Sequence, residues 1–105
     1  MEPLDIHTAM DGPTALLRVA GELDASTAST LDEALRRAAV DGVSERLVLD
    51  FRNLTFVDSA GLSVLVAAHK RLQREGAELV ISSPSAAVRR LFDIAGLDRV
   101  LTITE

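Results

Sequence analysis

The second half of the chain alternates between short apolar runs and amphipathic segments, and this alternation restricts the fold more than any other feature. The runs 47–51 and 77–82 have the length and composition of interior strands. A segment with apolar residues at helical spacing follows each run. Because a helix that joins two consecutive strands brings them parallel, the alternation predicts an α/β domain.

The first third of the chain adds a hairpin and a helix. Apolar and polar residues alternate over 4–8, a turn follows at Asp11-Gly12-Pro13, and 14–20 is again strand-like. Over 25–39 the apolar residues recur at spacings of three and four, which predicts an amphipathic helix. Asp24 stands where the N-cap of this helix is expected.

The remaining elements complete the order. Helices are predicted over 60–74 and from Ser83-Pro84, where the serine would be the N-cap and the proline the first helical residue. Gly96 takes the left-handed position that ends a helix, and a last strand is predicted over 100–104. The predicted order is β-β-α-β-α-β-α-β, a mixed and mostly parallel sheet in an α/β fold. No linker or repeat interrupts it, so residues 1–105 are interpreted as one domain.

Composition and charge exclude several classes of protein. The 105 residues include no cysteine, so no disulfide framework and no cysteine metal site is expected, and the cytoplasm is the expected location. The net charge of −5 argues against nucleic acid as a partner. No apolar run approaches the roughly 18 residues of a membrane span, so no membrane partner is expected. His7 and His69 lie on different predicted elements, which predicts no metal site.

The start of the helix near residue 60 is the most informative segment. If Asp58 is the N-cap, Val57 and Leu62 take the positions of a hydrophobic staple, whereas capping by Ser59 would put Asp58 and Ser63 there. The staple favours Asp58. Ser59 is then the first helical residue, and its hydroxyl lies at the positive end of a helix, where a phosphate is tolerated. The alternative is that Ser59 is an ordinary polar residue of the first turn.

An enzyme with Ser59 as nucleophile and His69 as base is disfavoured. The two residues are ten positions apart on one predicted helix, about 15 Å along its axis, whereas a base must lie within about 3 Å. The segment 57–61 also lacks the first glycine of a nucleophile elbow. No glycine-rich loop of the P-loop kind is present, so neither catalysis nor a bound cofactor is expected.

Three segments together resemble the STAS family, in particular its bacterial anti-sigma factor antagonists. They are Gly21-Glu22-Leu23-Asp24, 56–62 with the letters FVDSAGL, and 84–97 with the letters PSAAVRRLFDIAGL. The resemblance implies a STAS-like domain with helices mainly on one face of the sheet. It also implies that Ser59, directly after the aspartate, is phosphorylated. Many members carry a second serine next, where this chain has Ala60.

The resemblance further implies that phosphorylation switches the binding of an anti-sigma factor on and off. The unphosphorylated antagonist would bind an anti-sigma factor with a histidine-kinase-like ATPase fold and so release the sigma factor. That partner, a serine kinase, would phosphorylate Ser59 and end the complex, and a serine phosphatase would restore it. We expect the partner surface to combine the loop from Gly21 to Asp24, the turn at Asp58 and Ser59, and the exposed flank of the helix that follows, because both loops leave strand ends and start helices. Its expected residues are Gly21, Glu22, Asp24, Asp58, Ser59, Ala60, Gly61 and Ser63.

Two alternatives remain open. Asp24 and Asp58 either orient the partner or serve only as helix caps. Some STAS domains, moreover, are docking subunits of transporters or of lipid-transport complexes and have no phosphorylation cycle.

Overall fold

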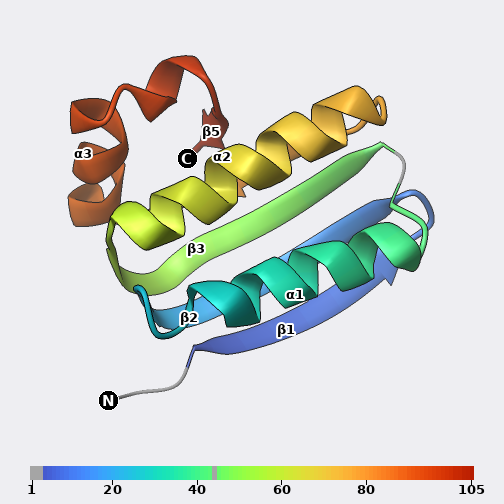
Figure 1. Cartoon of the computed structure of the whole chain (residues 1–105), viewed down its shortest axis with the longest axis horizontal. Helices are drawn as coiled ribbons and strands as arrows, with labels where there is room; N and C mark the ends of the chain where they lie inside the picture. Colours follow the sequence, from blue (N-terminus) through green and yellow to red (C-terminus); the bar gives the residue numbers. More distant parts are fainter. Residues whose placement is uncertain (1–3, 44) are drawn as a thin grey trace.

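The computed structural model describes residues 4–43 and 45–105 as a five-stranded sheet with helices packed on it (Figure 1). In chain order the elements are β1 (Asp5–Asp11), β2 (Thr14–Leu23), α1 (Ala28–Val40), β3 (Arg46–Val57), α2 (Ser59–Arg74), β4 (Glu78–Ser82), α3 (Ala86–Ile94), a 3₁₀ turn (Leu97–Arg99) and β5 (Thr102–Thr104). This confirms the predicted order of strands and helices.

The sheet is mixed, as predicted. The strands lie in the order β1-β2-β3-β4-β5, with β1 antiparallel to β2 and all other neighbours parallel. Successive strands are therefore adjacent in space. All parallel connections lead the chain through a helix, because parallel neighbours cannot be joined by a tight turn.

The core lies between the sheet and the helices. Figure 1 shows α1 and α2 lying side by side across one face of the sheet. In β3 the alternate residues Leu47, Leu49 and Phe51 are fully buried on that face. Phe51 stacks on Phe92 of α3, with ring centroids 6.4 Å apart, so α3 packs on the same face. The helices therefore cover one face of the sheet, as the resemblance implies.

Two predicted helix starts were wrong. The first helix begins at Ala28 with Thr27 as its N-cap, not after Asp24. The third is capped by Ser85, whose hydroxyl accepts a hydrogen bond from the Val88 amide at 3.2 Å. Ser83 has φ +54°, whereas Ser85 has the extended backbone (φ −62°, ψ 161°) that an N-cap requires.

The end of the third helix shows one confirmed prediction and one that was wrong. Gly96 has φ +74° and follows the helix in the left-handed conformation, as predicted. The helical spacing of Val88, Leu91, Phe92 and Ala95 predicts a buried stripe, but Ala95 is exposed. No helix in the described residues is long and apolar enough to cross a membrane.

Candidate functional site

The start of α2 is built around the carboxylate of Asp58. Asp58 has an extended backbone, and its Oδ1 accepts hydrogen bonds from the amides of Ala60 at 2.9 Å and Gly61 at 3.1 Å. The prediction that Asp58, and not Ser59, caps this helix is confirmed. The side chain of Asp58 thus satisfies two of the amides that a helix leaves unpaired at its start.

Ser59 is the first residue of α2, and its side chain is exposed. Its carbonyl oxygen accepts a hydrogen bond from the Ser63 hydroxyl at 2.9 Å. Within 4–43 and 45–105, no hydrogen bond engages the hydroxyl of Ser59 itself. A free hydroxyl therefore stands at the positive end of a sixteen-residue helix, where the helix dipole favours an added negative charge.

Gly61 lets α2 approach the sheet closely. A Cβ atom at this position would lie 2.6 Å from Cγ of Leu23 and 2.9 Å from Cγ2 of Val57. Both neighbours are fully buried at the ends of β2 and β3. Gly61 itself is buried, so its structural role is to hold the start of α2 against these two strand ends, and we expect it to act on any partner indirectly.

The loop after β2 lies beside this helix start. In the parallel pair of β2 and β3, Gly21 is opposite Leu54 and Leu23 is opposite Val57. The Asp58 amide donates a hydrogen bond to the Leu23 carbonyl at 3.1 Å, and the Thr55 hydroxyl donates to the Gly21 carbonyl at 3.1 Å. The structure thus brings the two predicted segments together at one end of the sheet. Gly21, Glu22 and Leu23 were wrongly predicted as a loop, because they continue the pairing of β2 with β3.

Asp24 organises a turn that precedes α1. Its Oδ1 accepts hydrogen bonds from the Ser26 hydroxyl at 2.7 Å, the Ser26 amide at 2.9 Å and the Thr27 amide at 3.2 Å. The hydroxyl of Thr27, a residue only 6% exposed, donates to the Glu22 carbonyl at 2.8 Å. The bond from the Ser26 hydroxyl is the main cause that lowers the pKa of Asp24, and the amide bonds and the Thr27 hydroxyl act in the same direction.

Other members of the predicted surface surround these two aspartates. Glu22 and Ser63 are exposed, while Ala60 is half-buried. Phe56, which was not among the predicted site residues, is 43% exposed directly before Val57 and pairs with Glu22 across the strands. A large aromatic residue that remains exposed next to the capping turn is a signal that sequence inspection alone could have used.

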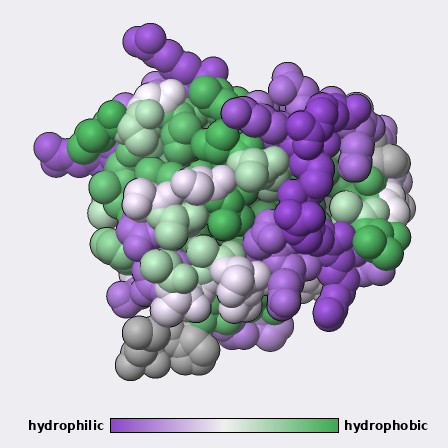
Figure 2. Space-filling view, viewed as in Figure 1, coloured by the Kyte–Doolittle hydropathy of each residue, from purple (hydrophilic) through white to green (hydrophobic). Residues whose placement is uncertain are grey.

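A groove continues from Ser59 along α2. It has a volume of about 540 Å³. Its lining residues are Ser59, Leu62, Ser63, Val66, Ala67, Lys70, Ala95 and Leu97. Figure 2 shows apolar surface gathered over the N-terminal part of α2 and over α3, with hydrophilic surface over the rest of the helix layer. The exposed flank of this helix was predicted as part of the partner surface, but the groove was not, because its second wall comes from the chain after α3.

A catalytic site with Ser59 as nucleophile would need His69 as its base. This residue is half-buried in the third turn of α2, and Ser59 begins the same helix. His7 lies on β1, where Nε2 is 3.3 Å from Oδ2 of Asp5. In the part of the chain that the structure describes, no three histidine or acidic residues are grouped as a metal site would require.

Sequence comparison places this chain among related proteins. A model of the family described as "STAS domain" matches residues 5–105. An anti-sigma-B factor antagonist of Listeria monocytogenes is 42% identical over 87 residues, which are 81% of this chain and 74% of that protein.

Solved structures have the same fold. An anti-sigma factor antagonist from Mycobacterium paratuberculosis has a TM-score of 0.78 and 28% identity, over 96% of this chain and 85% of that chain. The Bacillus protein SpoIIAA is known unphosphorylated (TM-score 0.80, 22% identity, 96% and 89% covered) and phosphorylated (TM-score 0.73, 22% identity, 96% and 92% covered). At 22% identity the likeness to SpoIIAA shows the fold alone.

Proposed function

This chain belongs to the STAS domain family, and we propose that it is an anti-sigma factor antagonist that phosphorylation of Ser59 switches off. In this proposal the unphosphorylated protein binds an anti-sigma factor and so frees a sigma factor. The anti-sigma factor has a histidine-kinase-like ATPase fold and transfers the γ-phosphoryl group of ATP to Oγ of Ser59, releasing ADP. A serine phosphatase removes the phosphate, and the cycle takes place in the cytoplasm.

The free hydroxyl of Ser59 is the observation that carries this proposal. It lies at the surface on the first residue of α2, and capping of the helix is done by the neighbouring Asp58. A kinase can therefore reach the oxygen without breaking a bond that holds the helix start together.

The fold is expected to tolerate the phosphate. Phosphorylation adds roughly −1.5 to −2 charge, and the start of a helix stabilises negative charge by about 0.3–1 kcal/mol. The fold of SpoIIAA, which this chain shares, exists in both forms. The proposed switch therefore acts on binding and not on unfolding.

The proposed partner surface has three parts. The first is the segment from Gly21 to Asp24 at the end of β2, and the second is the turn at Asp58 and Ser59. The Asp58 amide joins them by donating a hydrogen bond to the Leu23 carbonyl. The third is the groove along α2, which begins at Ser59 and is apolar over most of its length. Because Ser59 belongs to both the turn and the groove, a phosphate there would lie inside the contact area.

The expected effect on affinity follows from desolvation. A partner that closes over Ser59 must strip water from the phosphate next to the carboxylate of Asp58. An unpaired charge buried in an interface costs about 2–5 kcal/mol, which is about 30-fold to several-thousand-fold in affinity. This effect is large enough to act as a switch.

Phosphate mapping tests the proposal directly. The purified chain is incubated with its cognate anti-sigma kinase and ATP, and phosphopeptides are located by mass spectrometry. We expect one phosphate, on Ser59, and none in Ser59→Ala. Ser29→Ala, an exposed serine in the first turn of α1 and outside the proposed partner surface, is the matched control and should be phosphorylated like the original protein. A phosphate only on another residue would contradict the role of Ser59, and no phosphate with the cognate kinase would favour a docking subunit without a phosphorylation cycle.

A further inference from the structure

The exposed flank of α2 changes in character along its length. It begins with the hydroxyls of Ser59 and Ser63, continues through Val66 and reaches Lys70. The groove beside this flank is otherwise lined by the apolar residues Leu62, Ala67, Ala95 and Leu97. Among the described residues of the lining, Lys70 alone carries a charge. A segment that fills this groove therefore meets apolar side chains over most of its length and a cation at one end.

The ammonium group of Lys70 has no acidic partner in the part of the chain that the structure describes. The same holds for Arg74, which lies four residues later on the same side of α2, whereas Arg36 on α1 is paired with Asp32 at 2.9 Å. The last turn of a helix favours cations, which accounts for Arg74. Lys70 lies one turn earlier and beside the groove, so it is free to meet a carboxylate from outside the chain.

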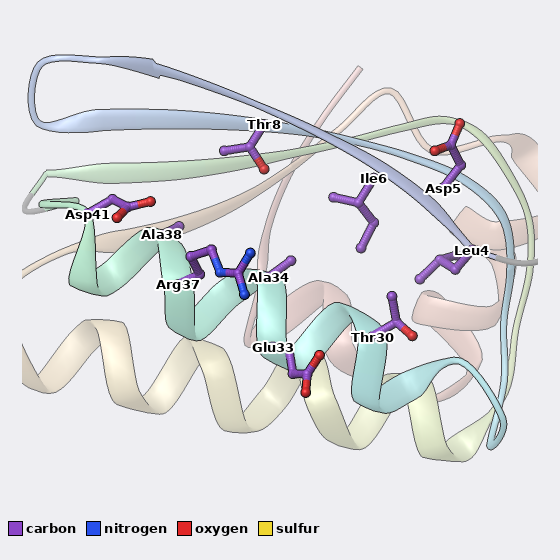
Figure 3. Close-up of a pocket in the computed structure, with 10 residues that line it drawn as sticks. All are labelled: Leu4, Asp5, Ile6, Thr8, Thr30, Glu33, Ala34, Arg37, Ala38 and Asp41. Carbon is purple, nitrogen blue, oxygen red and sulfur yellow. The ribbon is translucent and has the colours of Figure 1, made fainter.

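A groove on the other helix has a different pattern of charge. It has a volume of about 410 Å³ and runs between β1 and α1, where Asp5, Glu33 and Asp41 line it together with Arg37 (Figure 3). Mixed charges of this kind favour no one class of partner. The groove of α2 has an apolar centre and a charge of one sign at its end, which is complementary to an apolar segment that carries a carboxylate.

We propose that the anti-sigma factor places an apolar segment in the groove of α2 and a carboxylate against Nζ of Lys70. This inference rests on the proposed function. The groove begins at Ser59, which belongs to the proposed partner surface, so a partner that covers Ser59 lies at the mouth of the groove. The contact at Lys70 extends that surface along the helix.

The two ends of the extended surface have opposite charge. Glu22 and Asp24 lie beside Asp58 at the start of α2. Lys70 lies eleven residues after Ser59, about 16 Å along the helix axis. The reversed orientation of a partner that is basic at the first end and acidic at the second would bring like charges together. Lys70 thus sets the direction in which the anti-sigma factor lies along α2.

Cross-linking of the complex tests the contact directly. Lys70 is the only lysine among the 105 residues, and a carbodiimide joins an amine to a carboxylate that touches it. The full chain is cross-linked in complex with its cognate anti-sigma factor, and mass spectrometry locates the joined peptides. We expect Lys70 joined to an aspartate or glutamate of the anti-sigma factor. Lys70→Arg keeps the charge without the reactive amine, so it should bind more tightly than Lys70→Glu and yet lose this cross-link.

Isothermal titration calorimetry measures the affinity of the charge variants. Lys70→Glu should lower the affinity for the anti-sigma factor at least about tenfold, because it replaces an attractive pair by a repulsive one. Arg37→Glu makes the same charge change at an exposed site in the groove of α1 (Figure 3) and should change affinity less than about twofold. Lys70→Met keeps the apolar stem, and its affinity should depend less steeply on salt than that of the original. Circular dichroism checks that each variant is folded.

The outcomes separate this inference from the proposed function. Where Ser59→Asp loses affinity as expected, a missing cross-link at Lys70 or normal binding by Lys70→Glu overturns the inference alone. An anti-sigma factor that does not bind the unmodified chain overturns the proposed function and the inference together. A cross-link from Lys70 to a carboxylate, with loss of affinity in Lys70→Glu but not in Arg37→Glu, supports both.

Discussion

The starts of α1 and α2 contain the same residue types in two different arrangements. Each has an aspartate followed closely by a serine, Asp24 with Ser26 and Asp58 with Ser59. Before α1, the Ser26 hydroxyl donates to the Asp24 carboxylate at 2.7 Å. Both carboxylates accept from two backbone amides, but among the described residues that of Asp58 accepts from no hydroxyl in addition.

This difference decides which serine hydroxyl is engaged. The first turn needs the Ser26 hydroxyl as part of its hydrogen-bonded structure, whereas the second holds together without that of Ser59. Phosphorylation of a hydroxyl that stabilises a turn would break the hydrogen bond that this hydroxyl donates. The comparison teaches that an Asp–Ser pair at a helix start becomes a candidate switch when the aspartate is satisfied by backbone alone.

The largest expected effect tests the difference between the starts of α1 and α2. Ser59→Asp should lower affinity for the anti-sigma factor at least about 30-fold while the chain stays folded, because it puts a charge inside the proposed interface. Isothermal titration calorimetry measures the affinity. Ser29→Asp adds the same charge to the exposed first turn of α1 and should change affinity less than about threefold. Equal losses in both variants would show that net charge alone explains the effect.

A second prediction concerns packing. Gly61→Ala should lower the free energy of unfolding by about 1–3 kcal/mol, because the added Cβ has no room against Leu23 and Val57. Thr30 holds the equivalent position of α1 and is exposed, so Thr30→Ala should change stability by no more than about 0.5 kcal/mol. Urea denaturation compares the two variants. If Gly61→Ala is as stable as Thr30→Ala, the close approach of α2 is not required.

The smallest effect is a pH dependence. The pKa of Asp24 is lowered in the folded chain, so its contribution to stability is present above the ordinary value of about 3.9 and is lost as the pH falls through the folded pKa. Ser26→Ala removes the main cause and should raise the pKa of Asp24 towards that value. Stability of the variant should then fall less steeply below about pH 4.

NMR titration of the Asp24 carboxyl measures this shift directly. Ser29→Ala, which removes a hydroxyl from the neighbouring turn, is the control and should leave the titration of Asp24 unchanged. An unaltered Asp24 titration in Ser26→Ala would contradict the assigned cause.

Much of the fold could be predicted because its signals are local. The cap at Asp58 depends on hydrogen bonds to residues two and three positions ahead, and the left-handed Gly96 depends on its own backbone. Alternating burial in β3 follows from the same residues that identified it as a strand. The prediction of an exposed Ser59 as the first residue of α2 used only these local rules.

The wrong and missing predictions have local causes in some places and tertiary causes in others. Asp24 does not begin a helix, because the Thr27 hydroxyl is held by the Glu22 carbonyl and the turn between them is completed first. The groove along α2 was not predicted, because residues 95 and 97 reach that helix only after the chain has crossed the sheet. Local spacing contains no information about such contacts.

The sequence by itself determined the order of strands and helices, the aspartate that caps α2 and the serine that follows it. These depend on backbone geometry and on contacts within a few residues. Only the tertiary structure decided that Gly61 must lack a side chain and that a groove extends from Ser59. Each of those depends on atoms brought together from distant parts of the chain, where packing and not spacing fixes the distance.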